Sequence, residues 1–212
     1  IITGINMRMI RSFLIGLFLT IVGIAALMLI PSKQLEAPMP WEVTIMPDGN
    51  RHVFGIHLGT SNYGEAQQQL RQYGKTAIFT QEGVASSVEA YFNSINLGGL
   101  SAKLVLNLDV DENDIEYMLS RALEARLQTS GAHRYELANE DNISLVKAPI
   151  IAITYIPTVR LNADKVRYRF GPADSIVKDA DNPATEIWHY DSIGLTIRMN
   201  DSEKTILEYH LD

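Results

Sequence analysis

The side chains that could ligate a metal ion are scattered along this sequence. Five histidines are present, and no pair has the four-residue spacing that puts two ligands on one face of a helix. His52 and His57 are five residues apart in one predicted strand, so we expect their side chains on opposite faces of it. The absence of cysteine excludes disulfides and thiolate metal sites. The sequence therefore predicts no metal site and no cofactor.

Two polar runs approach known functional motifs and miss them. Residues 109–114 begin like a calcium-binding loop, but its sixth position is Asp114 instead of glycine and its twelfth is Ser120 instead of glutamate. Residues 59–64 resemble a nucleophile elbow, which needs one residue between its serine and its second glycine, whereas two follow Ser61. We therefore predict no catalytic residue. Ser61 is interpreted as a helix cap, and the acidic run as the start of a helix.

Aromatic side chains in the predicted strands are the candidate partner surface. They alternate with polar residues, so some rings fill the core and others can form an anchor patch for a partner. Core filling is the alternative for all of them. The candidate residues are Tyr91, Trp188, Tyr190 and Tyr209.

An apolar run near the start of the chain predicts a membrane anchor. Residues 13–30 carry no charge and follow Arg8 and Arg11, and at about 1.5 Å per residue they cover roughly 27 Å. The basic flank indicates a cytoplasmic segment 1–12, a transmembrane helix 13–30 and a linker 31–40. A cleaved signal peptide is the alternative, but the residues after Met28 lack the small residues that a signal peptidase accepts. We expect an uncleaved signal anchor in the inner membrane, with the C-terminal domain in the periplasm.

Small residues lie along one face of the predicted span. Gly16, Thr20 and Gly23 follow helical spacing and would let a second helix approach closely, which predicts a homodimer. Glycine is common in membrane helices in any case, which is the alternative explanation. The bilayer itself is the other partner expected for residues 13–30.

The rest of the chain is acidic and alternates predicted strands with helices. The formal net charge is −7, and because Arg8 and Arg11 are the only charged residues before position 31, the remainder carries −9. This charge argues against binding to nucleic acid. We predict helices from the capping residues Thr60 or Ser61, Asn113 and Asn162, ending at Gly74, Gly131 and Gly171. Strands are predicted at 41–46, 51–58, 76–79, 86–92, 103–108, 150–156, 186–190, 194–199 and 205–211.

The order of these elements indicates two related halves, 41–148 and 149–212. An aromatic residue precedes Gly74 and Gly171, and an aromatic strand follows each glycine. Coincidence between two strand–helix–strand units is the alternative. The predicted fold class is α+β, with one N-terminal transmembrane helix followed by an antiparallel sheet with packed helices.

One stretch of the second half resembles a known family. The pattern Leu161-Asn162, Val166, 169–174, 188–190 and 194–197 is similar to the small lipoprotein of the outer-membrane β-barrel assembly machine and to β-lactamase-inhibitor-protein repeats. The resemblance covers about 161–211, with an echo over 58–108. It implies helices packed on an antiparallel sheet whose surfaces bind other proteins, without catalysis. The absence of an acylated cysteine is a departure from that family.

Together these observations predict a membrane-anchored periplasmic protein that is not an enzyme and that binds an envelope protein or supports a membrane complex. Two alternatives stay open. An envelope hydrolase would use two convergent carboxylates, for which Glu89 and Glu186 are the candidates. A small-molecule sensing module would need an apolar pocket between the two halves.

Overall fold

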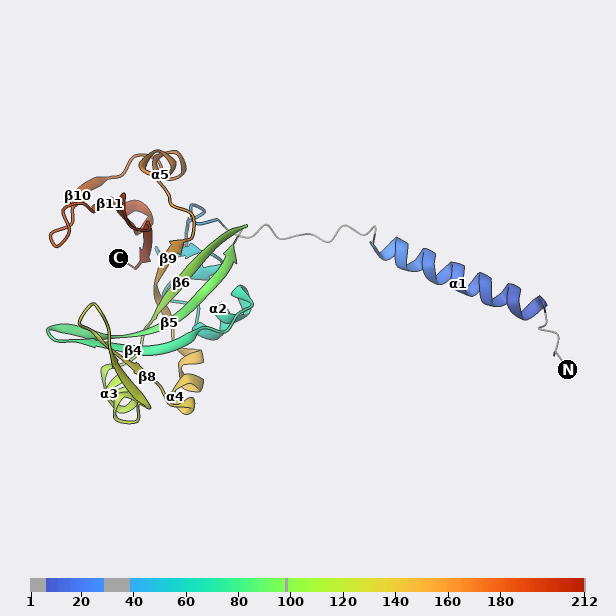
Figure 1. Cartoon of the computed structure of the whole chain (residues 1–212), viewed down its shortest axis with the longest axis horizontal. Coiled ribbons are helices and arrows are strands. Elements are labelled where there is room, and N and C mark those ends of the chain that lie inside the picture. Colours follow the sequence, from blue (N-terminus) through green and yellow to red (C-terminus); the bar gives the residue numbers. More distant parts are fainter. Residues whose placement is uncertain (1–6, 29–38, 98, 212) are drawn as a thin grey trace. The chain divides into compact units, whose positions relative to one another are not determined.

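The structure is a computed structural model that describes residues 7–28, 39–97 and 99–211 (Figure 1). Within the first helix it describes the side chains of residues 11–25. The chain forms two compact units, Ile1–Glu36 and Ala37–Asp212. The second unit contains the sheet and all of the core.

The first unit contains α1 (Met7–Met28), which overlaps the predicted transmembrane span. The described helix includes 13–28 of that span, about 24 Å at ~1.5 Å per residue, whereas a hydrocarbon core is about 30 Å thick. Among the described residues, no helix has the length and apolar character needed to cross a membrane. The prediction of a transmembrane helix at 13–30 is therefore wrong. The predictions of a signal anchor and of a single-pass inner-membrane location depend on this helix and are wrong for the same reason.

Other predictions for the first unit depend on that span or fall outside the described residues. Residues 1–6, 29 and 30 and most of the predicted linker, 31–38, are among the residues that are not described. Within α1, the Thr20 hydroxyl donates a hydrogen bond to the Gly16 carbonyl oxygen at 2.9 Å, one turn earlier. The homodimer through Gly16, Thr20 and Gly23 stays a prediction.

The second unit is built on one sheet of ten strands in the order β10-β11-β12-β13-β9-β6-β5-β4-β8-β7 (Figure 1). Every neighbouring pair is antiparallel. The strands are β4 (Lys75–Gln81), β5 (Val84–Leu97), β6 (Leu100–Leu108), β7 (Glu124–Leu127), β8 (His133–Glu136), β9 (Ile150–Pro157), β10 (Ser175–Lys178), β11 (Glu186–Tyr190), β12 (Leu195–Met199) and β13 (Ile206–His210).

A small three-stranded sheet and four helices complete the unit. The small sheet has β1 (Thr44–Ile45), β2 (Arg51–Val53) and β3 (Ile56–His57), and its first two strands form the hairpin that Pro47 and Gly49 predict. The helices are α2 (Tyr63–Leu70), α3 (Glu112–Ser120), α4 (Asn139–Ser144) and α5 (Ala163–Phe170), with short 3-10 turns at Leu145–Lys147 and Asp191–Ile193. The predicted fold class is therefore corrected to a mostly antiparallel sheet with five α-helices, α1 included, among the described residues.

Helices α2 and α5 begin in the same way. The Asn62 side chain accepts a hydrogen bond from the Glu65 amide at 2.9 Å, and the Asn162 side chain accepts one from the Lys165 amide at 3.0 Å. Each cap satisfies a free amide of the first helical turn. An antiparallel meander follows each helix, β4-β5-β6 after α2 and β10-β11-β12 after α5, and β13 and β9 join the two meanders. The two related halves, 41–148 and 149–212, stay a prediction.

The predicted helix from Asn113 to Gly131 is too long. Helix α3 is capped by Asp111 and ends at Ser120, and the residues after it form the β7–β8 hairpin. Gly131 has φ of 86° and lies in the turn of that hairpin. The sequence pattern continues the helical period through Leu123, but Leu123 is 67% exposed beside the hairpin and contributes nothing to a helix face.

One face of the large sheet packs into the core. Tyr155 of β9 and Tyr209 of β13 are fully buried there and contact Phe54 from the small sheet, with ring centroids 5.0 and 5.7 Å from it. Phe54 and Gly55 both have positive φ, as the tight turn between β2 and β3 requires. That strained turn directs the Phe54 ring onto the sheet.

Candidate functional site

Three of the four predicted partner residues are buried. Trp188 and Tyr209 are fully buried and Tyr190 is 4% exposed, so their rings fill the core. Tyr91 lies between the buried residues Ala90 and Phe92 of β5, and its half-buried side chain therefore points to the opposite face of the sheet. The structure does not bring the four together on one surface.

The two carboxylates considered for a hydrolase lie on opposite faces of the sheet. Glu89 alternates with buried core residues of β5, whereas Glu186 shares a face with Trp188, whose indole N–H donates to its carboxylate at 3.1 Å. Four strands separate β5 from β11. Hydrogen bonds from Lys178 and Trp188 lower the pKa of Glu186, while burial raises the pKa of Glu89. This pair cannot converge on one substrate atom.

Burial of Glu89 predicts a pH-dependent stability. Because its pKa is raised in the folded state, protonated Glu89 contributes stability that is full below its ordinary value of 4.5 and is lost as the pH rises through the folded pKa. Glu89→Gln should therefore increase the free energy of unfolding at neutral pH and change it little at low pH. Urea denaturation at both pH values measures this, with Glu82→Gln at the exposed β4–β5 turn as the control. A Glu89→Gln effect that is equal at both pH values would contradict the assignment.

His52 and His57 lie side by side, contrary to the prediction. They belong to neighbouring strands, β2 and β3, and are direct cross-strand partners, so their side chains share one face. The His57 Nε2 atom is 3.0 Å from an Asp48 carboxylate oxygen, and the Asn50 amide lowers the pKa of that carboxyl. In the described part of the chain, no group of three or more histidine or acidic side chains could hold a metal ion.

Side chains of the two polar runs, 59–64 and 109–114, form hydrogen bonds with nearby backbone amides. The Ser61 hydroxyl accepts a hydrogen bond from the His57 amide at 3.1 Å, and Asn62, not Ser61, caps α2. In the acidic run, Asp111 caps α3 by accepting from the Asn113 amide at 2.9 Å, which also lowers the pKa of Asp111. Both motifs therefore have a structural role.

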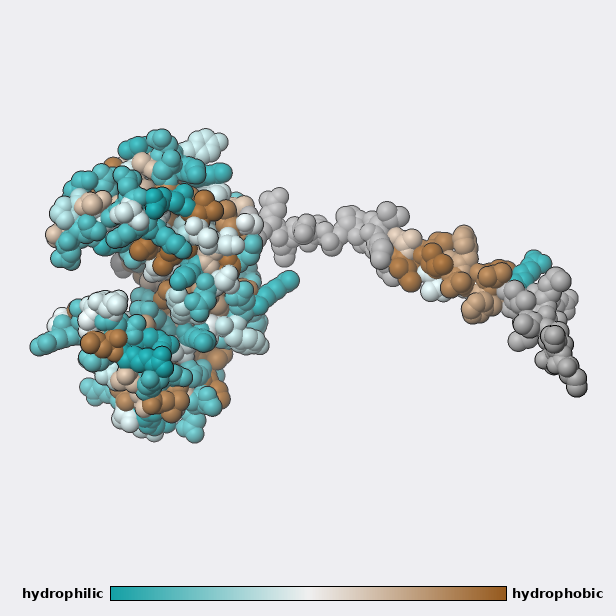
Figure 2. Space-filling model, viewed as in Figure 1, coloured by the Kyte–Doolittle hydropathy of each residue, from teal (hydrophilic) through white to brown (hydrophobic). Residues whose placement is uncertain are grey.

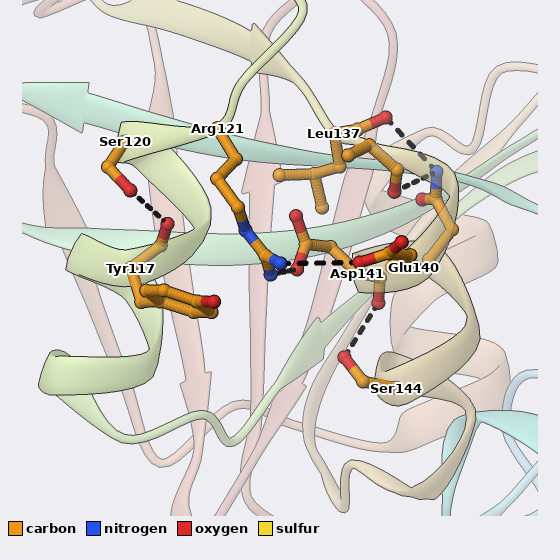
Figure 3. A network of polar contacts seen from close by, with 9 residues as sticks. Tyr117, Ser120, Arg121, Leu137, Glu140, Asp141 and Ser144 are labelled. Atoms are coloured by element: carbon orange, nitrogen blue, oxygen red, sulfur yellow. Dashed lines mark hydrogen bonds and ion pairs between the residues drawn. The ribbon is translucent and has the colours of Figure 1, made fainter.

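A buried ion pair joins the end of α3 to α4 (Figure 3). The Asp141 side chain is 3% exposed and contacts the Arg121 guanidinium, which is 3.4 Å from the Glu140 carboxylate. The Arg121 guanidinium carbon also lies 4.0 Å from the centre of the Tyr117 ring. Figure 3 shows Arg121 in contact with Asp141 and Glu140, and the Ser144 hydroxyl donating to the Asp141 carbonyl oxygen at 2.8 Å. We infer that these contacts stabilise the packing of α3 against α4.

An apolar cavity of about 600 Å³ lies between α5 and the adjoining ends of β6 and β9. Its wall is almost wholly apolar. We call it the Trp41 cavity, and it is lined by Pro40, Trp41, Leu100, Ser101, Tyr155, Pro157, Val159, Leu161, Asn162, Asp164, Lys165, Tyr168 and Arg169. Leu100 and Ser101 come from the first predicted half, and β9 and α5 from the second.

Hydrogen bonds fix the walls of the Trp41 cavity. The amide of Thr158 donates to the Ser101 carbonyl oxygen at 2.8 Å, which holds the end of β9 against the start of β6. The buried Thr205 hydroxyl donates to the Leu161 carbonyl oxygen at 2.8 Å and anchors the connection into α5. On the other side, the Tyr209 hydroxyl donates to the Pro40 carbonyl oxygen. The cavity is therefore preformed.

Aromatic rings and one guanidinium form the side of the cavity next to α5. The Arg169 guanidinium carbon is 4.1 Å from the centre of the Trp41 ring and 5.4 Å from that of Tyr168. Such stacking holds an indole ring in place by cation–π attraction. Tyr168 is 82% exposed, so its ring is accessible at the cavity.

Tyr155 lies among the residues around the cavity, but its hydroxyl is buried. Its side chain is fully buried, and its hydroxyl has no hydrogen-bond partner among the described residues. Burial raises the pKa of Tyr155 and raises that of Tyr209 well above its ordinary value. Both hydroxyls therefore stay protonated at neutral pH. An unpaired buried hydroxyl costs about 1–3 kcal/mol.

A second cavity of about 610 Å³ has a mostly polar wall. It lies beside α2, and Lys75, Arg126, Arg134 and Glu136 are among its lining residues. Arg126 is already paired with Glu124, with two hydrogen bonds of 2.8 Å. Its polar, highly charged wall suits water better than an apolar ligand, so the Trp41 cavity is the stronger candidate.

The sequence analysis missed the Trp41 cavity. Its residues come from 40–41, 100–101 and 155–169, and no local pattern connects these segments. The one signal was Trp41 itself, a large aromatic residue directly after a proline-rich stretch. No protein-family model, no curated protein and no solved structure matches the chain.

Proposed function

We propose that this protein is a non-enzymatic binding protein whose Trp41 cavity takes the apolar part of a small ligand. The observation that carries the proposal is a preformed cavity of about 600 Å³ with an almost wholly apolar wall. Small-molecule sites have volumes of about 300–1,000 Å³, apolar walls and a few polar groups that orient the ligand. The Trp41 cavity has each of these features.

The composition of the wall supports a rigid, flat or extended apolar group. Trp41, Tyr155 and Tyr168 provide aromatic faces, and Pro40 and Pro157 add rings that lose no side-chain freedom on binding. Because the hydrogen bonds around the cavity are made without a ligand, little ordering opposes binding. This is the arrangement expected of a sensing or carrier module, and the cavity combines residues of both predicted halves.

Trp41 provides a direct test of the proposal. The chain has two tryptophans, and Trp188 is fully buried in the core, so a ligand in the cavity changes the emission of Trp41. Titration of the full chain with decanol should shift this emission saturably, because apolar surface replaces water at the indole. Ligand that binds elsewhere, including on α1, which has no tryptophan, does not produce the signal.

The control for this titration is Trp41→Phe, which keeps an aromatic wall. It should abolish the change in emission while calorimetry still detects binding. The absence of a saturable response in the wild-type chain, together with the absence of calorimetric binding, would refute the proposal.

A further inference from the structure

Two basic side chains line the Trp41 cavity on the same face of α5. Lys165 and Arg169 are four residues apart, a spacing that places them one turn above each other. Since the cavity wall is almost wholly apolar, their aliphatic stems form part of the wall and their charged groups lie at its rim. The cavity therefore combines an apolar interior with a basic rim.

Neither of these charges has an ion-pair partner among the residues that the structure describes. Within residues 39–97 and 99–211, neither Lys165 nor Arg169 forms an ion pair, although this part of the chain is acidic overall. Asp164 is the carboxylate among the lining residues, but its side chain is 91% exposed and the cation near it is Arg167, at 3.9 Å. By contrast, Lys178, Arg126 and Arg198 each have a carboxylate partner.

The stacking of Arg169 suits it to bind an anion. Its guanidinium group lies over the Trp41 ring, and a guanidinium that stacks through its face keeps N–H groups at its edge for hydrogen bonds. Two such N–H groups match the two oxygens of a carboxylate. Arg169 and Lys165 together can therefore hold an anionic group next to the apolar interior.

We infer that the ligand of the Trp41 cavity is an amphiphilic anion, with its apolar body in the cavity and its anionic oxygens at Lys165 and Arg169. The inference rests on the proposed function and specifies its ligand class. The net charge of −7 repels anions in general, so a preference for an anion has to come from this local arrangement.

Three probes of equal chain length separate the effect of charge from that of the apolar body. Decanoate, decanol and decylammonium are titrated against the full chain at low salt, with Trp41 emission as the readout. Decanoate should bind about five- to tenfold more tightly than decanol, as two rim-exposed charge contacts imply. Decylammonium should bind more weakly than decanol. High salt should reduce the preference for decanoate, because it screens exposed charges.

Substitutions at Lys165 and Arg169 test whether these two side chains cause the preference for decanoate over decanol. In the double variant Lys165→Gln and Arg169→Gln, the preference should disappear, so that decanoate and decanol bind with equal affinity. The matched control is Lys178→Gln with Arg126→Gln, which changes the net charge equally but lies outside the cavity lining and should keep the preference.

The results of these titrations distinguish failure of the anion inference from failure of the proposed function. Equal binding of decanoate and decanol to the wild type, or an equal loss of preference in the control variant, would overturn the anion inference and leave the cavity as a neutral site. If none of the three probes binds, the proposed function fails, and the inference fails with it.

Discussion

Replacing Arg121 with methionine is expected to lower the free energy of unfolding by about 3–5 kcal/mol. The reason is the environment of Asp141, whose side chain is 3% exposed and whose carboxylate contacts the Arg121 guanidinium. Methionine has a similar length but no charge, so the variant leaves a buried carboxylate without its cation. Urea denaturation measures the loss, provided that the slope of the unfolding curve is unchanged.

An exposed ion pair supplies the control for this variant. Arg126 is paired with Glu124 through two hydrogen bonds, but the two side chains are 63% and 48% exposed. Arg126→Met should therefore cost less than about 1 kcal/mol. A double variant, Arg121→Met with Asp141→Leu, should recover much of the lost stability, because it removes the unpaired charge. Equal losses for Arg121→Met and Arg126→Met would show that the buried pair does not stabilise α3 against α4.

Val159→Trp should close the Trp41 cavity and weaken decanol binding by about 100-fold. Val159 lines the cavity and is 56% exposed, so an indole at this position can enter from the rim without displacing the core. Exclusion of about four methylene groups, each contributing about 0.8 kcal/mol, gives a loss of about 3 kcal/mol and hence the expected factor. Calorimetry measures it, since the added tryptophan complicates the fluorescence.

The control for Val159→Trp is Val84→Trp. Val84 is 63% exposed at the start of β5 and is not among the residues that line the cavity. This variant makes the same chemical change on the surface and should leave decanol affinity unchanged. If both variants bind decanol as the wild type does, the ligand does not occupy the cavity.

The second half of the chain was the easiest to predict, because its signals are local. Asn162 caps a helix, the apolar residues Val166 and Phe170 follow at helical spacing, and Gly171 ends it with φ of 81°. The helix has the predicted start and end. Strands β11, β12 and β13 also fall within a residue or two of the predicted ranges, because alternation of buried and exposed residues marks them clearly.

Predictions failed where tertiary contacts decide between two local patterns. The helical period of the sequence continues through Leu123, yet Leu127 pairs with His133 in an exposed hairpin. Tyr73 lies within the helix predicted to end at Gly74 but is 90% exposed, because α2 ends at Leu70 and Arg71 adopts a left-handed conformation with φ of 52°. Strand β10 was missed, since all four of its residues are exposed at the edge of the sheet.

The candidate site could not be predicted from the sequence for a related reason. Trp188 and Tyr209 were predicted to form a partner surface, but the alternation of apolar and polar residues does not say which face of a sheet is buried. The cavity forms where Trp41 meets α5, more than a hundred residues later in the chain. The pairing of β6 with β9 joins two walls of the cavity, whereas contacts from Tyr209 to Pro40 and from Arg169 to Trp41 hold Trp41 there.

A crystal structure of the full chain with 10-bromodecanol would show whether the Trp41 cavity binds an apolar ligand, because the anomalous signal of bromine locates the bound molecule. We expect one bromine position inside the Trp41 cavity, in contact with the Trp41 or Tyr168 ring. Bromine found only outside the cavity, with the cavity free of ligand density at saturating concentration, would contradict it.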